Sequence, residues 1–151
     1  EMLDYMMYKC NSKRVTIAEE VQLIQNYINL EQLRYGDRLA VVFNQNIDSF
    51  QTQIAPLILV SLIENAFKHG ASGSISTPKI AIEFKVKNNE LQFSIYNTKP
   101  AEAQEDETNF KKGIGLGNIK KQLSLIYPEK HVFDIKETKE SYLVNLNIQL
   151  L

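Results

Sequence analysis

Five polar residues in the stretch 56–70 have side chains suited to binding a charged ligand. At 100° per residue on an α-helix they fall within one arc of roughly 140°. Apolar side chains cover the rest of the predicted helix, which runs from Pro56 to Gly70 because proline suits a first turn and glycine an end. A solvated face is the commoner explanation of such a strip, but its narrowness and mixed chemistry favour a site. The five residues are Ser61, Glu64, Asn65, Lys68 and His69.

The segment GIGLGN, residues 113–118, is the second candidate for ligand binding. We expect it to lie between a loop and a helix, where glycines admit a ligand close to the backbone and free N–H groups favour phosphate. Lys111 and Lys112 add positive charge just ahead of it. The pattern is neither the dinucleotide fingerprint nor a Walker motif, and taken alone it is more often a tight turn.

Asn65 admits two interpretations from its chemistry. It is either a solvated asparagine or a Mg²⁺ ligand, since magnesium takes few protein ligands and keeps water and substrate phosphates. His69 and His131 lack the spacing of a zinc site, and we expect His131 to begin a strand and do nothing more. No nucleophile elbow supports Ser/His/Asp hydrolysis.

The periodicity of the chain predicts the elements that position these residues. The capping box Thr16–Glu19 opens a helix to about Tyr35, and a strand spans Leu39 to Ile47. Two hairpins follow, one turning at Asn88–Asn89 and one made of residues 131–136 and 142–150. Residues 98–112 are polar enough to form a long loop, and a helix from the glycine-rich segment reaches about Tyr127. This order predicts an α+β fold, a two-layer α/β sandwich with helices on one face of a mixed sheet.

Composition limits the function classes. The 151 residues suffice for one domain with a sizeable core, and the net charge of −1 gives no general attraction to nucleic acid. The one cysteine, Cys10, excludes an internal disulfide or a cysteine zinc site. No apolar run reaches the roughly 18 residues of a membrane span, and no secretory signal is visible. We expect an excised soluble piece, with room for a signal or a membrane span upstream.

The combined motifs are more specific than any one of them. ENAFKHG on a buried helix, a hairpin, a polar loop and GIGLGN together resemble the ATPase superfamily of gyrase, heat-shock chaperones, mismatch-repair proteins and histidine kinases. Within it the chain is similar to the ATP-binding end of LytS-like sensor histidine kinases, whose segment before the first strand resembles YINLEQLRYGDRL. The resemblance covers about residues 15–150 and implies the Bergerat-type ATP-binding fold.

The resemblance also implies roles for individual residues, with ATP and Mg²⁺ as the ligands. Asn65 would bind Mg²⁺, Lys68 and His69 would face the phosphates, and Glu64 would orient the metal or a water. Residues 98–112 would form a mobile lid over ATP. The far wall of the pocket would come from the glycine-rich segment, namely Lys112, Gly113, Gly115, Leu116, Gly117 and Asn118.

Two departures from the family pattern affect the expected function. Asn97 and Lys99 stand where the family usually has an aspartate for the adenine amino group and a glycine. An amide still accepts that hydrogen bond, but without the charge that roughly doubles its strength. The phosphoacceptor histidine of the family is absent, so residues 1–14 would be the remnant of a dimerisation helix and residues 15–151 the catalytic domain.

The resemblance therefore implies a two-component sensor histidine kinase, which transfers the ATP γ-phosphoryl group to a histidine upstream of this chain. Its partners would be a response regulator and its own dimerisation domain, as a homodimer, with no nucleic acid. The domain would be cytoplasmic, in a parent protein anchored in the bacterial inner membrane. The alternative is a degenerate nucleotide-binding or protein-interaction module with a regulatory or scaffolding role.

Overall fold

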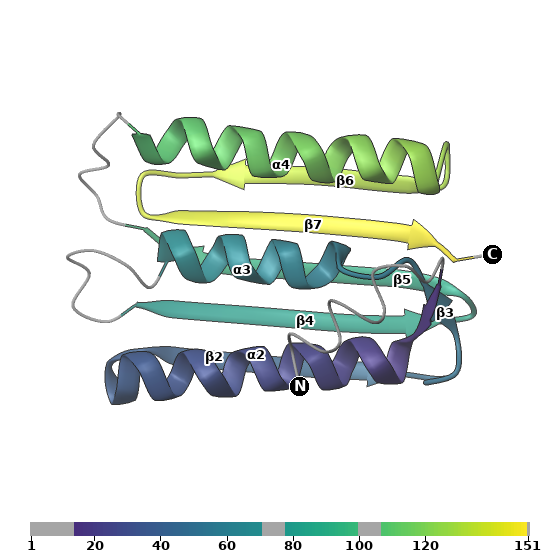
Figure 1. The fold of residues 1–151 in the computed structure, drawn as a ribbon, viewed down its shortest axis with the longest axis horizontal. Helices are drawn as coiled ribbons and strands as arrows, with labels where there is room; N and C mark the ends of the chain where they lie inside the picture. The colour runs from purple at the N-terminus through teal and green to yellow at the C-terminus, as the bar shows by residue number, and fades with distance from the viewer. Residues whose placement is uncertain (1–13, 71–77, 100–106, 151) are drawn as a thin grey trace.

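A five-stranded mixed sheet organises the computed structural model, which describes residues 14–70, 78–99 and 107–150. The strand order is β2-β4-β5-β7-β6, with β2 parallel to β4 and every other neighbouring pair antiparallel (Figure 1). The predicted mixed sheet is therefore confirmed. The strands are β2 (Ala40–Ile47), β4 (Lys79–Lys87), β5 (Glu90–Thr98), β6 (His131–Glu137) and β7 (Ser141–Gln149).

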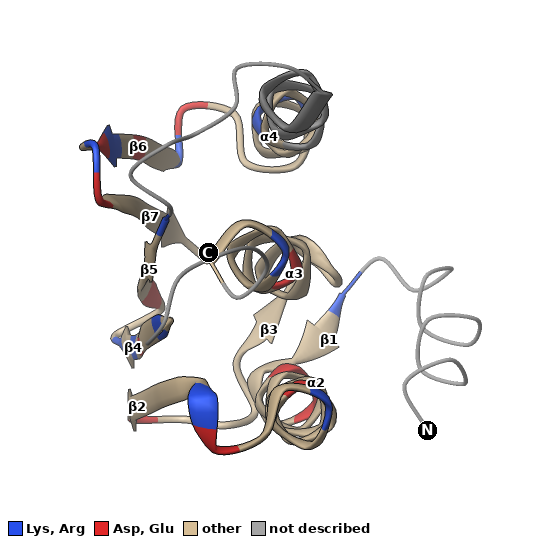
Figure 2. Cartoon of the chain, turned by 90° about the vertical axis from the view of Figure 1, so that its left-hand side faces the viewer, with Lys and Arg blue, Asp and Glu red and all other residues tan. Residues whose placement is uncertain are grey.

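Three helices of the described residues line up on one face of this sheet. They are α2 (Ile17–Tyr35), α3 (Ile58–Gly70) and α4 (Glu107–Ile126), with α3 between the other two (Figure 2). No helix of the described part of the chain covers the opposite face of the sheet. This arrangement confirms the predicted two-layer α/β sandwich.

The core lies between the two layers. Alternating residues of β4 and β5 point toward the helices, and Phe84 and Phe93 meet edge to face with ring centroids 5.7 Å apart. From the other layer, α3 buries eight of its thirteen residues. The apolar residues that alternate along β4 and β5, and those that recur at helical spacing in α3, are the residues that the fold buries. The patterns in the sequence therefore predict these three elements correctly.

Helix α2 begins and ends where its sequence predicts. The Thr16 hydroxyl accepts the Glu19 backbone N–H at 3.2 Å, and the Glu19 carboxylate accepts the Thr16 N–H at 2.8 Å, so the predicted capping box is confirmed. Gly36, at φ 67°, follows the last helical residue and begins the short 3₁₀ helix Gly36–Arg38. The upstream helix expected in residues 1–11 lies outside the described residues.

Helix α3 begins two residues later than predicted. Pro56 and Leu57 form a turn, and Leu57 has φ 72°, a left-handed conformation that cannot continue into an α-helix. The helix consequently starts at Ile58, where the Leu57 carbonyl accepts the Ser61 N–H at 3.1 Å. Two strands of two residues, β1 (Val15–Thr16) and β3 (Gln53–Ile54), pair antiparallel beside it and were not predicted.

Both predicted hairpins are present. Asn88 and Asn89 take φ of 52° and 62° between β4 and β5, as expected for asparagines in a two-residue turn. The closing hairpin is β6 and β7, and His131 begins β6 as predicted.

The expected boundary between the polar loop and the glycine-rich helix is wrong. Helix α4 begins at Glu107, so residues 107–112 are helical and GIGLGN lies inside the helix instead of at its start. Glutamate and lysine are strong helix formers, and Leu116, Ile119 and Leu123 supply a buried apolar stripe that holds the helix on the core. Residues 100–106 of the expected lid lie outside the described residues.

Candidate functional site

The polar strip of α3 forms one side of the candidate site. Glu64 and Lys68 are exposed, Asn65 and His69 are half-buried, and the apolar residues between them are buried. Ser61 belongs to the same strip, but its hydroxyl donates to the Leu57 carbonyl at 2.7 Å. The structure thus confirms that α3 is buried except for this strip, which carries an acid, an amide, a lysine and a histidine.

Glu64 marks the edge of the strip that faces α2. Tyr27 of α2 packs edge to face on Phe67, with ring centroids 5.5 Å apart. Burial raises the pKa of Tyr27, and the negative charges of Glu31 and Glu64 raise it further. Since Asn65 lies 100° and His69 140° around the helix from Glu64, the strip extends from the α2 side across the outward face of α3.

Asn97, the candidate adenine contact, lies at the C-terminal end of α3. Its side chain is 1% exposed, and its Nδ2 donates to the Thr98 carbonyl at 3.0 Å. Gly70, the last residue of α3, packs against it so closely that a Cβ at position 70 would lie 2.6 Å from the Asn97 Cβ. The structure therefore brings the strip-bearing helix and the candidate adenine contact together, although 26 residues separate α3 from that contact in the printed sequence.

Lys99 is tied to the closing hairpin. Its Nζ lies 2.6 Å from Glu137 Oε1, and its backbone N–H donates to the Glu140 carbonyl at 3.0 Å. The Lys99 side chain is 14% exposed. Lys99 therefore connects the end of β5 to β6 and to the β6–β7 turn.

Tyr142 lies beside Asn97 in the sheet and was not recognised from the sequence. It is the register partner of Asn97 across β5 and β7, and it is 4% exposed. Burial raises the pKa of Tyr142 to about 12, with a further contribution from the Glu137 carboxylate. A tyrosine on a strand gives no signal of its neighbours, because those are fixed by strand pairing.

Helix α4, which contains the glycine-rich segment, packs beside α3 (Figure 1). Leu116 is buried, Gly117 is half-buried and Asn118 is exposed, and a Cβ at Gly117 would meet nothing within 4 Å. Lys112, Gly113 and Gly115 lie in the preceding turns of the same helix. Because backbone N–H groups inside an α-helix bond to the residue four positions earlier, this conformation does not present them to a phosphate.

His131 is remote from this constellation. It lies on β6, at the edge of the sheet, and its Nδ1 is 2.7 Å from the Tyr127 carbonyl oxygen. Its environment agrees with the prediction that it serves as the first residue of a strand. Among the residues described, no group of three or more His, Cys, Asp and Glu side chains could hold a metal ion. Nor does any described helix combine the length and apolar content needed to cross a membrane.

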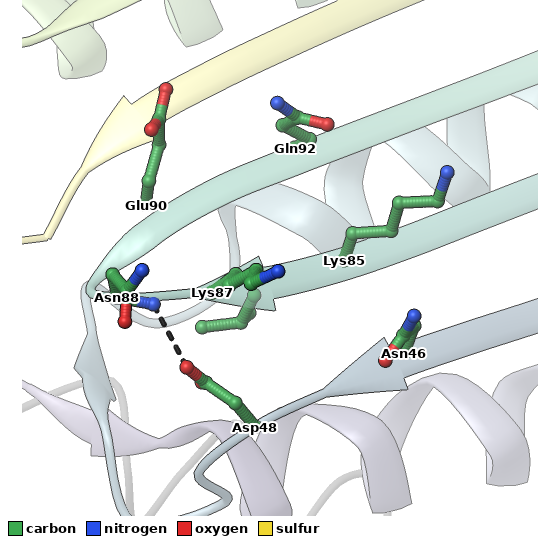
Figure 3. Close-up of a pocket in the computed structure, with 8 residues that line it drawn as sticks. Asn46, Asp48, Lys85, Lys87, Asn88, Glu90 and Gln92 are labelled. Atoms are coloured by element: carbon green, nitrogen blue, oxygen red, sulfur yellow. Dashed lines mark hydrogen bonds between the residues drawn. The ribbon is translucent and has the colours of Figure 1, made fainter.

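A separate hollow lies on the helix-free face of the sheet. It has a volume of about 350 Å³ and lies near the β4–β5 turn, where the Asp48 carboxylate accepts the Asn88 N–H at 2.8 Å (Figure 3). Its polar lining comes from Asn46, Lys85, Glu90 and Gln92 among others, all remote from α3 across the sheet. The strip of α3 and this hollow are therefore on opposite faces, and the predicted site residues are all absent from the hollow.

Comparison with known proteins identifies the relatives of this chain. The family described as Histidine kinase matches residues 1–39. The sensor histidine kinase BtsS of Escherichia coli K12 is 26% identical over 148 residues, covering 94% of this chain and 26% of BtsS. The sensor protein LytS of Enterococcus faecalis is 23% identical over 147 residues, covering 90% of this chain and 25% of LytS. The chain thus spans about a quarter of the length of these curated relatives.

Solved structures share the fold. The nucleotide-free catalytic domain of the histidine kinase ThkA superposes with a TM-score of 0.59 at 14% identity, covering 90% of this chain and 94% of that domain. ThkA in complex with the response regulator TrrA gives a TM-score of 0.59 at 13% identity, covering 99% of this chain and 46% of that one. Full-length ShkA in complex with AMPPNP superposes with a TM-score of 0.59 at 15% identity. The match covers 89% of this chain and 30% of the ShkA chain.

Proposed function

Because the chain is a relative of the sensor histidine kinases and has the fold of their catalytic domain, we propose that residues 15–151 form the ATP-binding catalytic domain of such a kinase. The full protein would transfer the γ-phosphoryl group of ATP to a histidine upstream of this chain, and residues 1–14 would continue its dimerisation helix. The observation that supports this most directly is the exposed strip of α3, which ends at the contact between Gly70 and Asn97.

The residues of the strip suit a nucleotide with its metal. Asn65 would hold Mg²⁺ through its amide oxygen, and a single protein ligand fits a cation that keeps water and phosphate oxygens. Bound there, Mg²⁺ would neutralise charge on the phosphates. Lys68 and His69 would face those phosphates, and Glu64 would orient the metal or a water from the α2 side of the strip.

The other end of the nucleotide would reach Asn97. Its Nδ2 already donates to the Thr98 carbonyl, so its Oδ1 is the atom that would accept the adenine amino group. From α4, Lys112 and the segment Gly113–Asn118 would close the far wall, and Leu116 would hold that segment on the core. Phosphate contact by the N–H groups of this segment would require its first turns to unwind, because they are helical in this structure.

Catalysis by this site would consist of positioning and charge neutralisation. Phosphoryl transfer needs little covalent chemistry from the protein, which fits a site of one amide, one lysine and backbone N–H groups. The nucleotide complex of ShkA supports the proposed ligand, and the ThkA–TrrA complex supports a response regulator as partner. A homodimer and a cytoplasmic position beneath the bacterial inner membrane are proposed from the kinship with sensor kinases.

A second candidate function is a regulatory or scaffolding module that has lost strong nucleotide binding. The substitution pattern favours it, since a neutral Asn97 replaces the aspartate and Lys99 is engaged with Glu137. Such a module would keep the fold and bind proteins instead of a nucleotide.

Calorimetric titration with ADP and ATP, with and without Mg²⁺, distinguishes the two candidate functions. We expect Kd values in the micromolar to millimolar range, equivalent to roughly 4 to 8 kcal/mol. Asn65→Ala should remove the Mg²⁺ dependence, while Asn46→Ala, on the opposite face of the sheet, should change nothing. No heat and no thermal shift at millimolar Mg·ATP would favour the second candidate.

A further inference from the structure

Tyr127, the residue after α4, joins three parts of the chain at one hydroxyl. Its side chain is 2% exposed, and its oxygen accepts the Ala55 backbone N–H at 2.9 Å. The Arg14 guanidinium donates to the same oxygen, and its carbon lies 4.7 Å from the centre of the tyrosine ring. Arg14 is therefore held by a hydrogen bond and by a cation–π contact at once.

The hydroxyl and its two partners, Arg14 and Ala55, belong to three different segments. Arg14 precedes β1, Ala55 lies between β3 and α3, and Tyr127 follows α4. Antiparallel pairing of Val15 with Ile54 brings the first two segments side by side, and in the view of Figure 2 the paired strands β1 and β3 lie between α2 and α3. The segment through which the upstream chain joins the domain is consequently bound to the start of α3 and to the end of α4.

The turn that leads into α3 is also held from α2. Leu57 takes a left-handed φ of 72°, which costs energy for a residue with a side chain. The Glu20 carboxylate accepts its backbone N–H at 3.4 Å, and Glu20 is fully buried. The side chains of Tyr127, just after α4, and of Glu20 in α2 thus accept the Ala55 and Leu57 N–H groups immediately before the helix that bears the polar strip.

We propose that Arg14 and Tyr127 are positioning residues for the nucleotide site, because together they fix the start of α3 to the segment that follows the upstream chain. A displacement of the chain ahead of residue 14 would move Arg14, and through the Tyr127 hydroxyl and Ala55 it would move the helix that bears Asn65 and Lys68. The expected effect on nucleotide binding rests on the proposed function. The connection from Arg14 through the Tyr127 hydroxyl to the start of α3 rests on the hydrogen bonds alone.

Three variants test the link. Tyr127→Phe keeps the buried ring and removes the hydroxyl, Arg14→Ala removes the guanidinium, and the third variant combines both. Arg38→Ala, in the exposed 3₁₀ helix after α2, is the matched control for loss of an arginine. For each protein we would measure the Kd of Mg·ADP by calorimetry and amide hydrogen exchange along the chain.

We expect each single change to weaken Mg·ADP by roughly fivefold, the equivalent of one hydrogen bond. The double variant should lose less than the sum of the two single effects, because both changes remove the same hydrogen bond between Arg14 and the Tyr127 hydroxyl. Exchange should accelerate selectively at residues 58–64 of α3, and the strands β5 and β7 should keep the exchange of the unmodified chain. Arg38→Ala should match the unmodified chain in both measurements.

Additive effects, or exchange that accelerates equally in α3 and in the sheet, would overturn the proposal and leave a contact that contributes only to global stability. Unchanged Kd and unchanged exchange would overturn it as well. If the unmodified chain binds no nucleotide, the proposed function fails, and the exchange measurement alone decides whether Arg14 and Tyr127 hold the start of α3.

Discussion

Gly70 and Asn97 lie in direct contact, so the last turn of α3 closes onto the end of β5. A Cβ at position 70 would lie 2.6 Å from the Asn97 Cβ and 3.1 Å from the Thr98 carbonyl oxygen. The close approach requires a glycine here, whereas the backbone conformation does not, since the φ of Gly70 is not positive. The contact joins the candidate phosphate end of the site to the candidate adenine end.

Gly70→Ala should therefore destabilise the fold. The added methyl meets a buried side chain and a backbone oxygen, neither of which can move freely, so we expect a loss of about 1–3 kcal/mol in the free energy of unfolding. Gly117→Ala is the control, because a Cβ there meets nothing within 4 Å and alanine favours a helix by up to about 1 kcal/mol. Urea denaturation of both variants measures the difference, and equal stability of the two would contradict the contact.

Asn97→Asp should tighten adenine nucleotides and weaken the apo fold. A carboxylate is the stronger acceptor for the adenine amino group, which we expect to improve Kd about fivefold. Without nucleotide the same change replaces the Nδ2 donor by an oxygen facing the Thr98 carbonyl, in a position that is 1% exposed. Titration with ADP and urea denaturation test the two effects separately. Equal or weaker ADP affinity would show that the pocket is adapted to asparagine.

Alkaline pH should destabilise the domain through its buried tyrosines. The pKa of Tyr142 is raised from 10.0 to about 12, and burial also raises the pKa values of Tyr27 and Tyr127. Above pH 10 the unfolded chain loses these protons while the folded chain keeps them, so stability falls as pH rises from 10 toward 12. The slope is at most about 1.4 kcal/mol per pH unit for each tyrosine.

Urea denaturation at pH 8, 9, 10 and 11 measures this dependence. Tyr142→Phe should reduce the slope between pH 10 and 11 and leave the slope below pH 9 unchanged. A midpoint that stays constant from pH 9 to 11 would show that these tyrosines ionise as easily in the folded chain as in the unfolded one.

The sequence predicted those elements whose pattern is local. The strip of α3, the Thr16–Glu19 capping box and the Asn88–Asn89 turn each depend on residues within a few positions of one another, and each is found in the structure. The mixed sheet was predicted from two antiparallel hairpins together with a strand that precedes the central helix in the sequence.

Features that depend on distant residues could not be predicted in the same way. Leu57 adopts its left-handed φ beside Glu20, which lies 37 positions away, and Arg14 meets Tyr127 across 113 positions. The start of α4 was misplaced for a different reason. Three glycines and a polar approach are typical of a loop, but the buried stripe of Leu116, Ile119 and Leu123 stabilises a helix that extends back to Glu107.

The final prediction concerns phosphorylation. Incubated alone with Mg·ATP, this chain should not become phosphorylated on histidine. Transfer needs the acceptor in line with the γ-phosphate, at about 3–3.5 Å. His131 lies on the edge strand β6 with its Nδ1 2.7 Å from the Tyr127 carbonyl, and it is remote from α3. His69 belongs to α3 itself, half-buried beside the proposed phosphate contacts, so its own helix keeps it from an in-line position.

An acceptor supplied in trans should restore labelling. A longer form of the protein that includes the upstream histidine, with its own ATP site inactivated by Asn65→Ala, would provide the acceptor to the intact site of this chain. Asn65→Ala in this chain as well should then abolish the labelling, because Mg²⁺ would lose its protein ligand, while Asn46→Ala on the far face of the sheet should preserve it. Acid-labile radiolabel on the chain alone, lost on replacing His69 or His131, would show that the acceptor lies within this domain.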